Sequence, residues 1–452
     1  MKKNILRKKL LPPSAIMAIG FLLLILIGAT ILTLPFSSRS GRPTPLLDAL
    51  FVATSASCVT GLITVDTATH WSGVGQLVIL ILIQIGGLGF MTMASIASFA
   101  MRRTFTLRER MVMSAGMSLS ENAGIVRLTS RVLKGTLFFE GLGALLLSIR
   151  FVPLYGFGVG VKMGIFHSIS AFCNAGFDLM GTPNAPFVSL TGYANDPLVC
   201  LTLMGLVIVG GLGFFVWNDV WNRRNVRRLR LHTKLVLITT GILLLVGFGF
   251  TLLFEWNNPN TLGELSTGQK IMAAAFQTVT LRTAGFNTID EAALTGPSQA
   301  LACFLMLIGG SPGSTAGGIK TTTLAVLLLC TISALYGKTE IAAFGRAISP
   351  RTVMNAVTMA SVGVVCSVAG ACAICYWEAA PFHVCLFETT SAIATVGLSM
   401  GLTPSLHVAS RLLLILFMYL GRVGVLTLGV AVLMRHREPP RIAYPEEQVM
   451  VG

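Results

Sequence analysis

Charged residues are scarce in this chain: Asp, Glu, Lys and Arg make up only 11% of its 452 residues, while 54% are hydrophobic. Soluble globular domains usually contain about 25% charged residues. The composition therefore argues against a water-soluble protein and indicates a polytopic membrane protein. The net charge of +15 is explained by Lys and Arg in cytoplasmic loops, so we expect no nucleic-acid partner.

The chain also lacks the patterns of several other functional classes. Its nine cysteines are scattered, mostly within apolar segments, which favours neither a zinc site nor a disulfide framework. No H-E-x-x-H or G-x-G-D pattern occurs, so an intramembrane enzyme is not expected. No G-x-G-x-x-G opens a βαβ unit. We therefore expect no covalently bound cofactor, and nucleotide control only through a partner.

Eight long stretches with few or no charges predict eight membrane spans, each near the ~20 residues that a bilayer requires. The first, 15–36, follows a basic arm without a clear cleavage site, so we expect it to be retained rather than removed as a signal peptide. The others are 71–101, 132–153, 197–218, 235–254, 298–337, 352–377 and 412–434.

The distribution of basic residues predicts the orientation. Of the 33 Lys and Arg, 24 fall in five segments, namely 1–13, 102–134, 222–234, 337–351 and 435–441. Because cytoplasmic loops are enriched in these residues, we expect both termini in the cytoplasm.

Four short segments of one kind lie between consecutive spans. They read FVATSASCVTGL from Phe51, FHSISAFCNAGF from Phe166, FQTVTLRTAGF from Phe276 and FETTSAIATVGL from Phe387. Their glycines, Gly61, Gly176, Gly285 and Gly397, are 115, 109 and 112 residues apart, and the third copy is one residue shorter. A fourfold internal repeat is the simplest explanation.

Each segment is too short to cross a bilayer, so it predicts a half-helix that enters the membrane and turns back. Non-helical backbone at that depth must be buried in protein or line a watery path. Four such turns around one axis can present carbonyl rings that replace the hydration shell of an alkali cation. Glycine fits such a turn because it reaches uncommon backbone angles and adds no side chain. The alternative is a set of tight turns between packed helices.

We thus predict an all-α polytopic membrane protein built from four tandem helix–pore-loop–helix repeats, with eight transmembrane helices and four re-entrant half-helices around a central pore. The expected boundaries are a cytoplasmic arm 1–13, repeats 14–110, 111–231, 232–348 and 349–436, and a cytoplasmic tail 437–452. The third repeat contains an intramembrane loop, 309–320.

The sequence resembles the Ktr/Trk/HKT superfamily of potassium transporters over nearly its whole length, and within it most closely the membrane subunit of bacterial Ktr systems. The four turn segments match the filter segments of that superfamily. The stretches IQIGGLGFMT (83–92) and GGSPGSTAGGIKTT (309–322) match two of its second helices. The Gly- and Pro-rich third-repeat loop is also similar to the TrkH branch, whereas the chain length favours the Ktr branch.

The resemblance implies a K⁺-selective pore, a homodimer in the bacterial cell membrane, and a cytosolic nucleotide-binding regulatory ring of the Ktr or Trk type. Uptake that depends on Na⁺ is common in Ktr systems, and a Na⁺-conducting member is the alternative. Glycine at all four filter positions favours K⁺. The implied filter residues, with K⁺ as the bound ion, are Val59, Thr60, Gly61, Asn174, Ala175, Gly176, Thr283, Ala284, Gly285, Thr395, Val396 and Gly397.

Residues 309–318, GGSPGSTAGG, contain five glycines and a proline and cannot sustain a helix. The resemblance implies that this loop is a gate below the filter; a passive kink is the alternative. Lys320 either snorkels to the inner surface or pairs with an acid. The predicted gate residues are Gly309, Gly310, Ser311, Gly313, Ser314, Gly317, Gly318, Lys320 and Arg422.

Arg422 has ten uncharged residues before it and twelve after it within the last span. A mid-membrane Arg costs ~2.5–3.5 kcal/mol on insertion scales. We expect it to face the pore, where it slows cations or holds the gating loop through its carbonyls; a structural ion pair is the alternative.

Four further residues receive weaker interpretations. Asp48 lies near a helix start, where the helix dipole stabilises it. Glu388 is expected to brace the filter backbone, with Arg282 as a candidate partner. Asn174 and Thr395 either hydrogen-bond behind the filter or line it.

Overall fold

A computed structural model describes residues 13–89, 125–223, 225–338 and 340–424. The expected arm 1–13 lies almost wholly outside the described residues. So do most of the basic segment 102–134, the tail 437–452, and the ends of the spans 71–101 and 412–434.

The described chain is helical apart from one hairpin of two-residue strands, β1 (Ala342–Ala343) and β2 (Arg346–Ala347). The helices are α1 (Pro13–Thr33), α2 (Leu46–Cys58), α3 (Thr67–His70), α4 (Gly73–Leu88), α7 (Ile125–Tyr155), α8 (Phe157–Phe172), α9 (Pro197–Leu212), α10 (Phe214–Arg223), α11 (Leu231–Glu255), α12 (Thr267–Thr280), α13 (Gly296–Leu307), α14 (Thr321–Leu335), α15 (Pro350–Glu378), α16 (Phe382–Ala394) and α17 (Val408–Val423). The predicted all-α class is confirmed.

Four of the described helices, α1, α7, α11 and α15, are long and apolar enough to cross a membrane by themselves. The expected span 197–218 is broken rather than straight: α9 ends at Leu212, and α10 leaves it at an angle of 89°. The expected span 298–337 is split into α13 and α14 around the Gly-rich loop, as its composition predicts.

The half-helices α2, α8, α12 and α16 correspond to the four repeated segments. Pro45 and Pro381 directly precede α2 and α16, where proline ends the preceding extended chain and pre-sets the first helical turn. Ser266 and Gln269 form a capping box at the start of α12, which satisfies two amide donors. The starts of these three half-helices are therefore marked in the local sequence.

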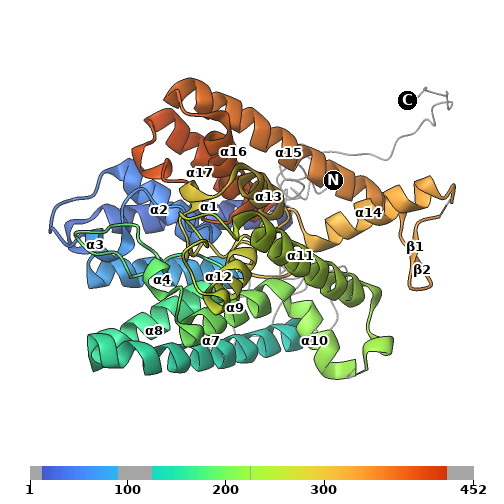
Figure 1. The fold of residues 1–452 in the computed structure, drawn as a ribbon, viewed down its shortest axis with the longest axis horizontal. Coiled ribbons are helices and arrows are strands. Elements are labelled where there is room, and N and C mark those ends of the chain that lie inside the picture. Colours follow the sequence, from blue (N-terminus) through green and yellow to red (C-terminus); the bar gives the residue numbers. More distant parts are fainter. Residues whose placement is uncertain (1–12, 90–124, 224, 339, 425–452) are drawn as a thin grey trace, which may run out of the picture.

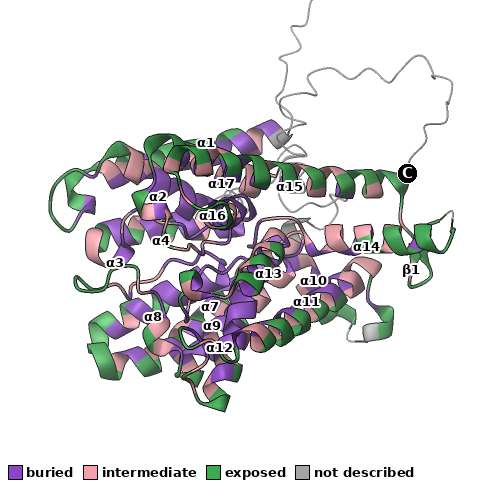
Figure 2. Ribbon diagram, turned by 45° about the horizontal axis from the view of Figure 1, so that its top comes forward, coloured by how far each residue is buried: buried purple, intermediate pink, exposed green. Residues whose placement is uncertain are grey.

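Burial in this molecule differs from that of a water-soluble domain. Large apolar side chains such as Phe157 and Leu335 are 79% and 81% exposed, whereas the Ser and Thr residues of the half-helices α2 and α16 are buried. Figure 2 shows buried residues concentrated at the centre and exposed ones along the outer helices. A lipid-facing surface around a polar centre accounts for this pattern.

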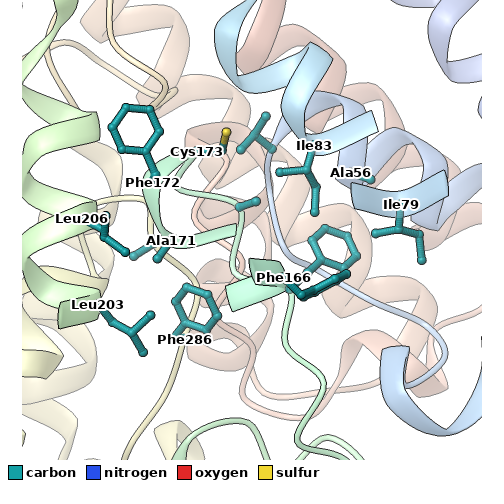
Figure 3. Close-up of a cluster of buried hydrophobic side chains, with 14 of the residues drawn as sticks. Ala56, Ile79, Ile83, Phe166, Ala171, Phe172, Cys173, Leu203, Leu206 and Phe286 are labelled. Atoms are coloured by element: carbon teal, nitrogen blue, oxygen red, sulfur yellow. The ribbon is translucent and has the colours of Figure 1, made fainter. Parts of the chain in front are cut away.

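The repeats follow one another around the molecule. Figure 1 shows the N-terminal helices α1–α4 on the left, α7 and α8 below, and α15–α17 above, with the half-helices directed towards the centre. A hydrophobic cluster packs the first three repeats together. It joins Ala56 of α2, Ile83 of α4, Phe172 of α8, Leu206 of α9 and Phe286 (Figure 3).

Three of the repeats share a close contact between a helix and a half-helix. A Cβ at Gly86, Gly210 or Gly421 would lie 2.0–2.1 Å from the carbonyl oxygen of Ser57, Phe172 or Ile393, respectively. Each of these carbonyls belongs to the residue four positions before the turn glycine of its repeat. Only glycine permits this approach, so in these three repeats the second helix packs directly against the end of the half-helix.

We expect Gly210→Ala to lower the melting temperature of the purified protein, because its Cβ would overlap the Phe172 carbonyl oxygen and overpacking typically costs ~1–3 kcal/mol. Gly205→Ala on the same helix is the matched control, since a Cβ there has no heavy atom within 4 Å. Equal melting temperatures for the two variants would contradict the packing argument.

Candidate functional site

The four half-helices end in turns with the same backbone geometry. The residue two positions before each glycine has a positive φ, at 58° for Val59, 59° for Asn174, 67° for Thr283 and 53° for Thr395. The glycines are also positive, at 98° for Gly61, 69° for Gly176, 78° for Gly285 and 97° for Gly397. Non-glycine residues rarely adopt this region. This conformation recurs at the same position of all four repeats, which indicates that the surrounding structure holds the turns in a strained backbone conformation.

Backbone hydrogen bonds close these turns. The amides of Thr60, Ala175 and Val396 each donate over five residues, to Ser55, Ser170 and Ser391, at 2.8 Å. This is the longer bond of a helix-terminating Schellman turn. In the third repeat the Ala284 amide instead donates over four residues to Thr280 at 2.9 Å. That shorter ring matches the one residue missing from the third segment.

The four glycines converge in cyclic order. A Cβ at each would meet the backbone carbonyl oxygen just before the glycine of the next repeat: Gly61 the oxygen of Ala175 at 2.6 Å, Gly176 that of Ala284 at 2.8 Å, Gly285 that of Val396 at 2.6 Å, and Gly397 that of Thr60 at 2.2 Å. The fourth contact returns to the first repeat. The turns therefore form a closed ring around one axis at the centre of the molecule.

The carbonyl groups of this ring have no hydrogen-bond donor. All twelve residues of the expected filter, three in each turn, have backbone oxygens that accept no hydrogen bond from the described part of the chain. The eight non-glycine members are at most 1% exposed. Buried carbonyls are nearly always paired in native proteins, so this cluster is an unusual concentration of free acceptors.

Two buried acids support the outer side of the ring. Glu388 accepts hydrogen bonds from the Ser399 hydroxyl at 2.6 Å, the Met400 amide at 3.0 Å and the Thr403 hydroxyl at 2.5 Å. It braces the chain after the fourth turn, although its expected partner Arg282 lies elsewhere. In the third repeat Glu291 accepts from Gln277 at 2.9 Å, and burial raises the pKa of this outer-loop carboxyl to about 8.

The Gly-rich loop between α13 and α14 packs against the broken end of α9. The amides of Ser311 and Thr315 donate to the carbonyls of Gly211 at 3.0 Å and Gly210 at 3.3 Å, and the Phe214 amide donates to Gly313 at 2.9 Å. Helix C-termini leave carbonyls without intrahelical partners. The loop satisfies those of α9, and the break at Gly213 makes room for it.

The same loop contacts the filter turns. The Thr315 hydroxyl lies 3.0 Å from Asn174 Oδ1 and 3.1 Å from the Phe172 carbonyl. The Asn174 side chain thus hydrogen-bonds to the loop, which agrees with one of the two alternatives left open by its position. Thr395 Oγ1 has no partner among the described residues, and the loop residue Gly317 sits against it, since a Cβ there would lie 2.0 Å from that oxygen.

Arg422 reaches the loop from α17. Its guanidinium donates to the carbonyls of Thr315 and Gly86, and to that of Gly87 at 3.0 Å. Within the described residues it forms no ion pair with a carboxylate. This geometry agrees with an arginine that holds the loop through carbonyls and not with the alternative of a structural ion pair.

Arg422 interrupts a motif that the repeats share. The second helices end in GGLG at 86–89, GGLG at 210–213, GGSP at 309–312 and GRVG at 421–424. Arg422 therefore occupies the position of Gly87, Gly211 and Gly310. Our sequence reasoning did not use this alignment. It is the signal by which the break of α9 at Gly213 could have been found.

Two of the remaining predictions are refined by the structure. Asp48 lies in the first turn of α2, as expected, and also pairs with Arg411 at 2.7 Å. Lys320 forms no ion pair with an acid in the part of the chain that the structure describes; its ammonium group donates to the Ala316 carbonyl at 2.8 Å, within the loop itself. The Lys320 side chain therefore forms its hydrogen bond to a backbone carbonyl of the same loop.

The described residues contain no cluster of three His, Cys, Asp or Glu side chains that could hold a metal ion. All nine cysteines are free. Cys372 and Cys375 are spaced as C-x-x-C on α15, but no third ligand accompanies them in this part of the chain.

Comparison with known proteins gives consistent matches over the whole chain. A family model described as TrkH, cation transport protein, matches residues 14–439. The chain is 41% identical to the potassium/sodium uptake protein NtpJ of Enterococcus hirae, over 100% of this chain and 99% of that one. It is 40% identical to the Ktr system potassium uptake protein B of Bacillus subtilis, over 97% of each chain.

The fold also matches a solved structure, the potassium transporter TrkH from Vibrio parahaemolyticus. The TM-score is 0.72 at 18% sequence identity, with 96% of this chain and 87% of that chain covered. At this identity the similarity concerns the fold, and it confirms the helical pore architecture.

We expect Gly61→Ser to reduce discrimination between K⁺ and Na⁺. Its Cβ would lie 2.6 Å from the Ala175 carbonyl oxygen, and a side chain at φ 98° adds backbone strain of roughly 1–3 kcal/mol. Relative K⁺ and Na⁺ uptake in a host deficient in potassium uptake provides the measurement. Gly41→Ser, outside the ring and with open space around its Cα, is the control. An unchanged ratio in Gly61→Ser would exclude Gly61 from the filter.

Proposed function

We propose that this chain, which belongs to the TrkH family of cation transport proteins, is the K⁺-translocating membrane subunit of a Ktr-like bacterial potassium uptake system. The observation that carries the proposal is the ring of twelve carbonyls without donors from the described chain, all but that of Gly397 on buried residues. Leaving such groups unpaired is costly, whereas rings of carbonyls replace the hydration shell of an alkali cation. The names of the relatives support K⁺ as the cargo.

Selection of K⁺ is assigned to the four turns. Each contributes three consecutive carbonyls, and glycine at the third position leaves the axis free of side chains. Na⁺ transport is the second candidate, because one relative is named a potassium/sodium uptake protein. Na⁺ as a coupling or stimulating ion is part of the proposal.

Ion flux into vesicles that contain only the purified protein tests this proposal, with K⁺ and Na⁺ gradients imposed separately and protein-free vesicles as the control. We expect K⁺ to enter faster than Na⁺. Faster Na⁺ flux would favour the second candidate, and the absence of both fluxes would reject transport by this chain alone.

The gate is assigned to the loop and Arg422. The loop crosses the end of α9 next to the filter, and the guanidinium adds a fixed positive charge beside it. A cation that leaves the filter meets both. The expected gate residues Gly309, Gly310, Ser311, Gly313, Ser314, Gly317, Gly318 and Lys320 all belong to this loop.

The surroundings of the transporter are also part of the proposal. The chain is a multi-pass membrane protein. We assign it to the bacterial cell membrane with both termini in the cytoplasm, because 24 of its 33 Lys and Arg fall in the five segments expected on one side of the membrane and cytoplasmic loops are enriched in these residues. A homodimer and a cytosolic nucleotide-binding ring are proposed as partners, since a relative is named for a Ktr system.

We expect deletion of residues 311–316 to increase K⁺ flux in the absence of the regulatory partner, because the segment that lies below the filter is removed. Deleting residues 343–346, at the exposed tip of the β1–β2 hairpin, is the control and should leave flux unchanged. If well-folded protein without 311–316 conducts no faster than wild type, the loop is a passive kink.

We expect Arg422→Gln to increase K⁺ flux by roughly tenfold, as for the loss of a barrier of about 1.4 kcal/mol. The positive charge is removed, while the turns and the bonds between the loop and α9 remain. The ratio of K⁺ to Na⁺ flux should therefore stay near that of wild type.

Arg411→Gln on the same helix is the matched control for Arg422→Gln. Arg411 pairs with Asp48 rather than with the loop, so its loss should lower the melting temperature without raising flux. If Arg422→Gln behaves like Arg411→Gln, with slower flux and earlier melting, the arginine is structural and its gate role is wrong.

A further inference from the structure

The four filter turns are not supported in the same way. In the first and fourth repeats, a serine six residues before the turn glycine accepts a hydrogen bond from the amide of that glycine. The hydroxyl of Ser55 accepts from Gly61 at 3.0 Å, and the hydroxyl of Ser391 accepts from Gly397 at 3.1 Å. The equivalent hydroxyl in the second repeat, that of Ser170, has no partner among the described residues. In the third repeat, whose segment is one residue shorter, the hydroxyl of Thr280 donates instead to the Phe286 carbonyl at 2.5 Å. The first and fourth turns are thus the ones in which a serine of the half-helix binds the glycine amide.

The second and third turns are braced by each other and by the gating loop. Asn174 Nδ2 lies 3.4 Å from the Arg282 carbonyl and 3.4 Å from Thr283 Oγ1, so it joins the two turns. The other end of the same amide faces the Thr315 hydroxyl at 3.0 Å. One side chain therefore links both turns to the middle of the loop.

Arg282 makes a second link, to the start of the loop. Its Nη2 donates to the Gly309 carbonyl at 3.1 Å. The side chain is 8% exposed, and Nε and Nη1 have no partner in the described part of the chain. A buried guanidinium with unpaired donors is unfavourable, so packing alone does not explain an arginine here. Its bond to the loop does.

These contacts give the loop two points of attachment to the same half of the filter. Asn174 and Thr283 both hold a left-handed backbone, which persists only where the surroundings enforce it. Removing the loop would take away the partner of Asn174 on one side and that of Arg282 on the other, while Ser55 and Ser391 would still hold the remaining turns.

We propose that the gating loop also sets the ion selectivity of the filter, because it holds the second and third turns in shape through Asn174 and Arg282. Withdrawal of the loop frees these two turns and weakens discrimination between K⁺ and Na⁺. Gate and filter are then one coupled unit. This inference rests on the proposed function, transport of K⁺ through the ring of turns.

Thr315→Val tests the coupling, because it removes the hydroxyl that contacts Asn174 and keeps the shape of the side chain. The ratio of K⁺ to Na⁺ flux into vesicles should fall about fivefold, the factor that corresponds to one buried hydrogen bond. Thr315→Ser retains the hydroxyl and should keep the ratio of wild type. Deleting residues 311–316 should lower the ratio at least as much as Thr315→Val.

Thr240→Val is the matched control. Thr240 lies on α11 and lines the same small cavity as Arg282, but its hydroxyl has no partner among the described residues. It should leave the ratio unchanged. K⁺ flux with the wild-type ratio in both Thr315→Val and the deletion would refute the coupling while leaving the proposed function intact. Wild-type protein that carries no K⁺ would refute both.

Discussion

The need to satisfy buried backbone polar groups governs this structure. Four turns hold twelve carbonyl groups at the centre of the molecule without any donor from the described chain, although such groups are almost always paired. The surrounding structure holds Val59, Asn174, Thr283 and Thr395 at positive φ, which keeps the turns in this arrangement. Packing of the surrounding side chains and helices stabilises this arrangement. In the proposed function, the free carbonyls replace the hydration shell of a cation.

The same requirement builds the region below the ring. Where α9 breaks at Gly213, its last carbonyls receive amides from the Gly-rich loop. Where α4 ends, the carbonyls of Gly86 and Gly87 receive the guanidinium of Arg422. The loop amides and the Arg422 guanidinium thus both donate to carbonyl groups at a helix C-terminus, which have no partner within the helix. Bonds of this kind can be exchanged for water, which fits the proposed role of the loop as a gate.

The four repeats share one arrangement, and a few positions depart from it. Four glycines close a cyclic ring, and the second helices share a terminal glycine motif. Arg422 replaces glycine at one position of that motif, and a Gly-rich loop interrupts the second helix of the third repeat. In the second repeat the hydroxyl of Ser170 has no partner among the described residues. In the proposed coupling, the hydrogen bonds of Asn174 and Arg282 to the loop make the second and third turns depend on it more than the other two do.

Composition and repeat spacing determined the membrane class, the four half-helices and the interruption at 309–318, because charge content, apolar length and glycine placement act locally along the chain. They also singled out Arg422, because a charge is costly wherever it lies in a span. Only the tertiary structure decided its partners, the break in α9, and the roles of Glu388 and Arg282. Those depend on which distant segments meet: Thr315 and Asn174, whose hydrogen bond joins loop to filter, are 141 residues apart, and no local pattern encodes that distance.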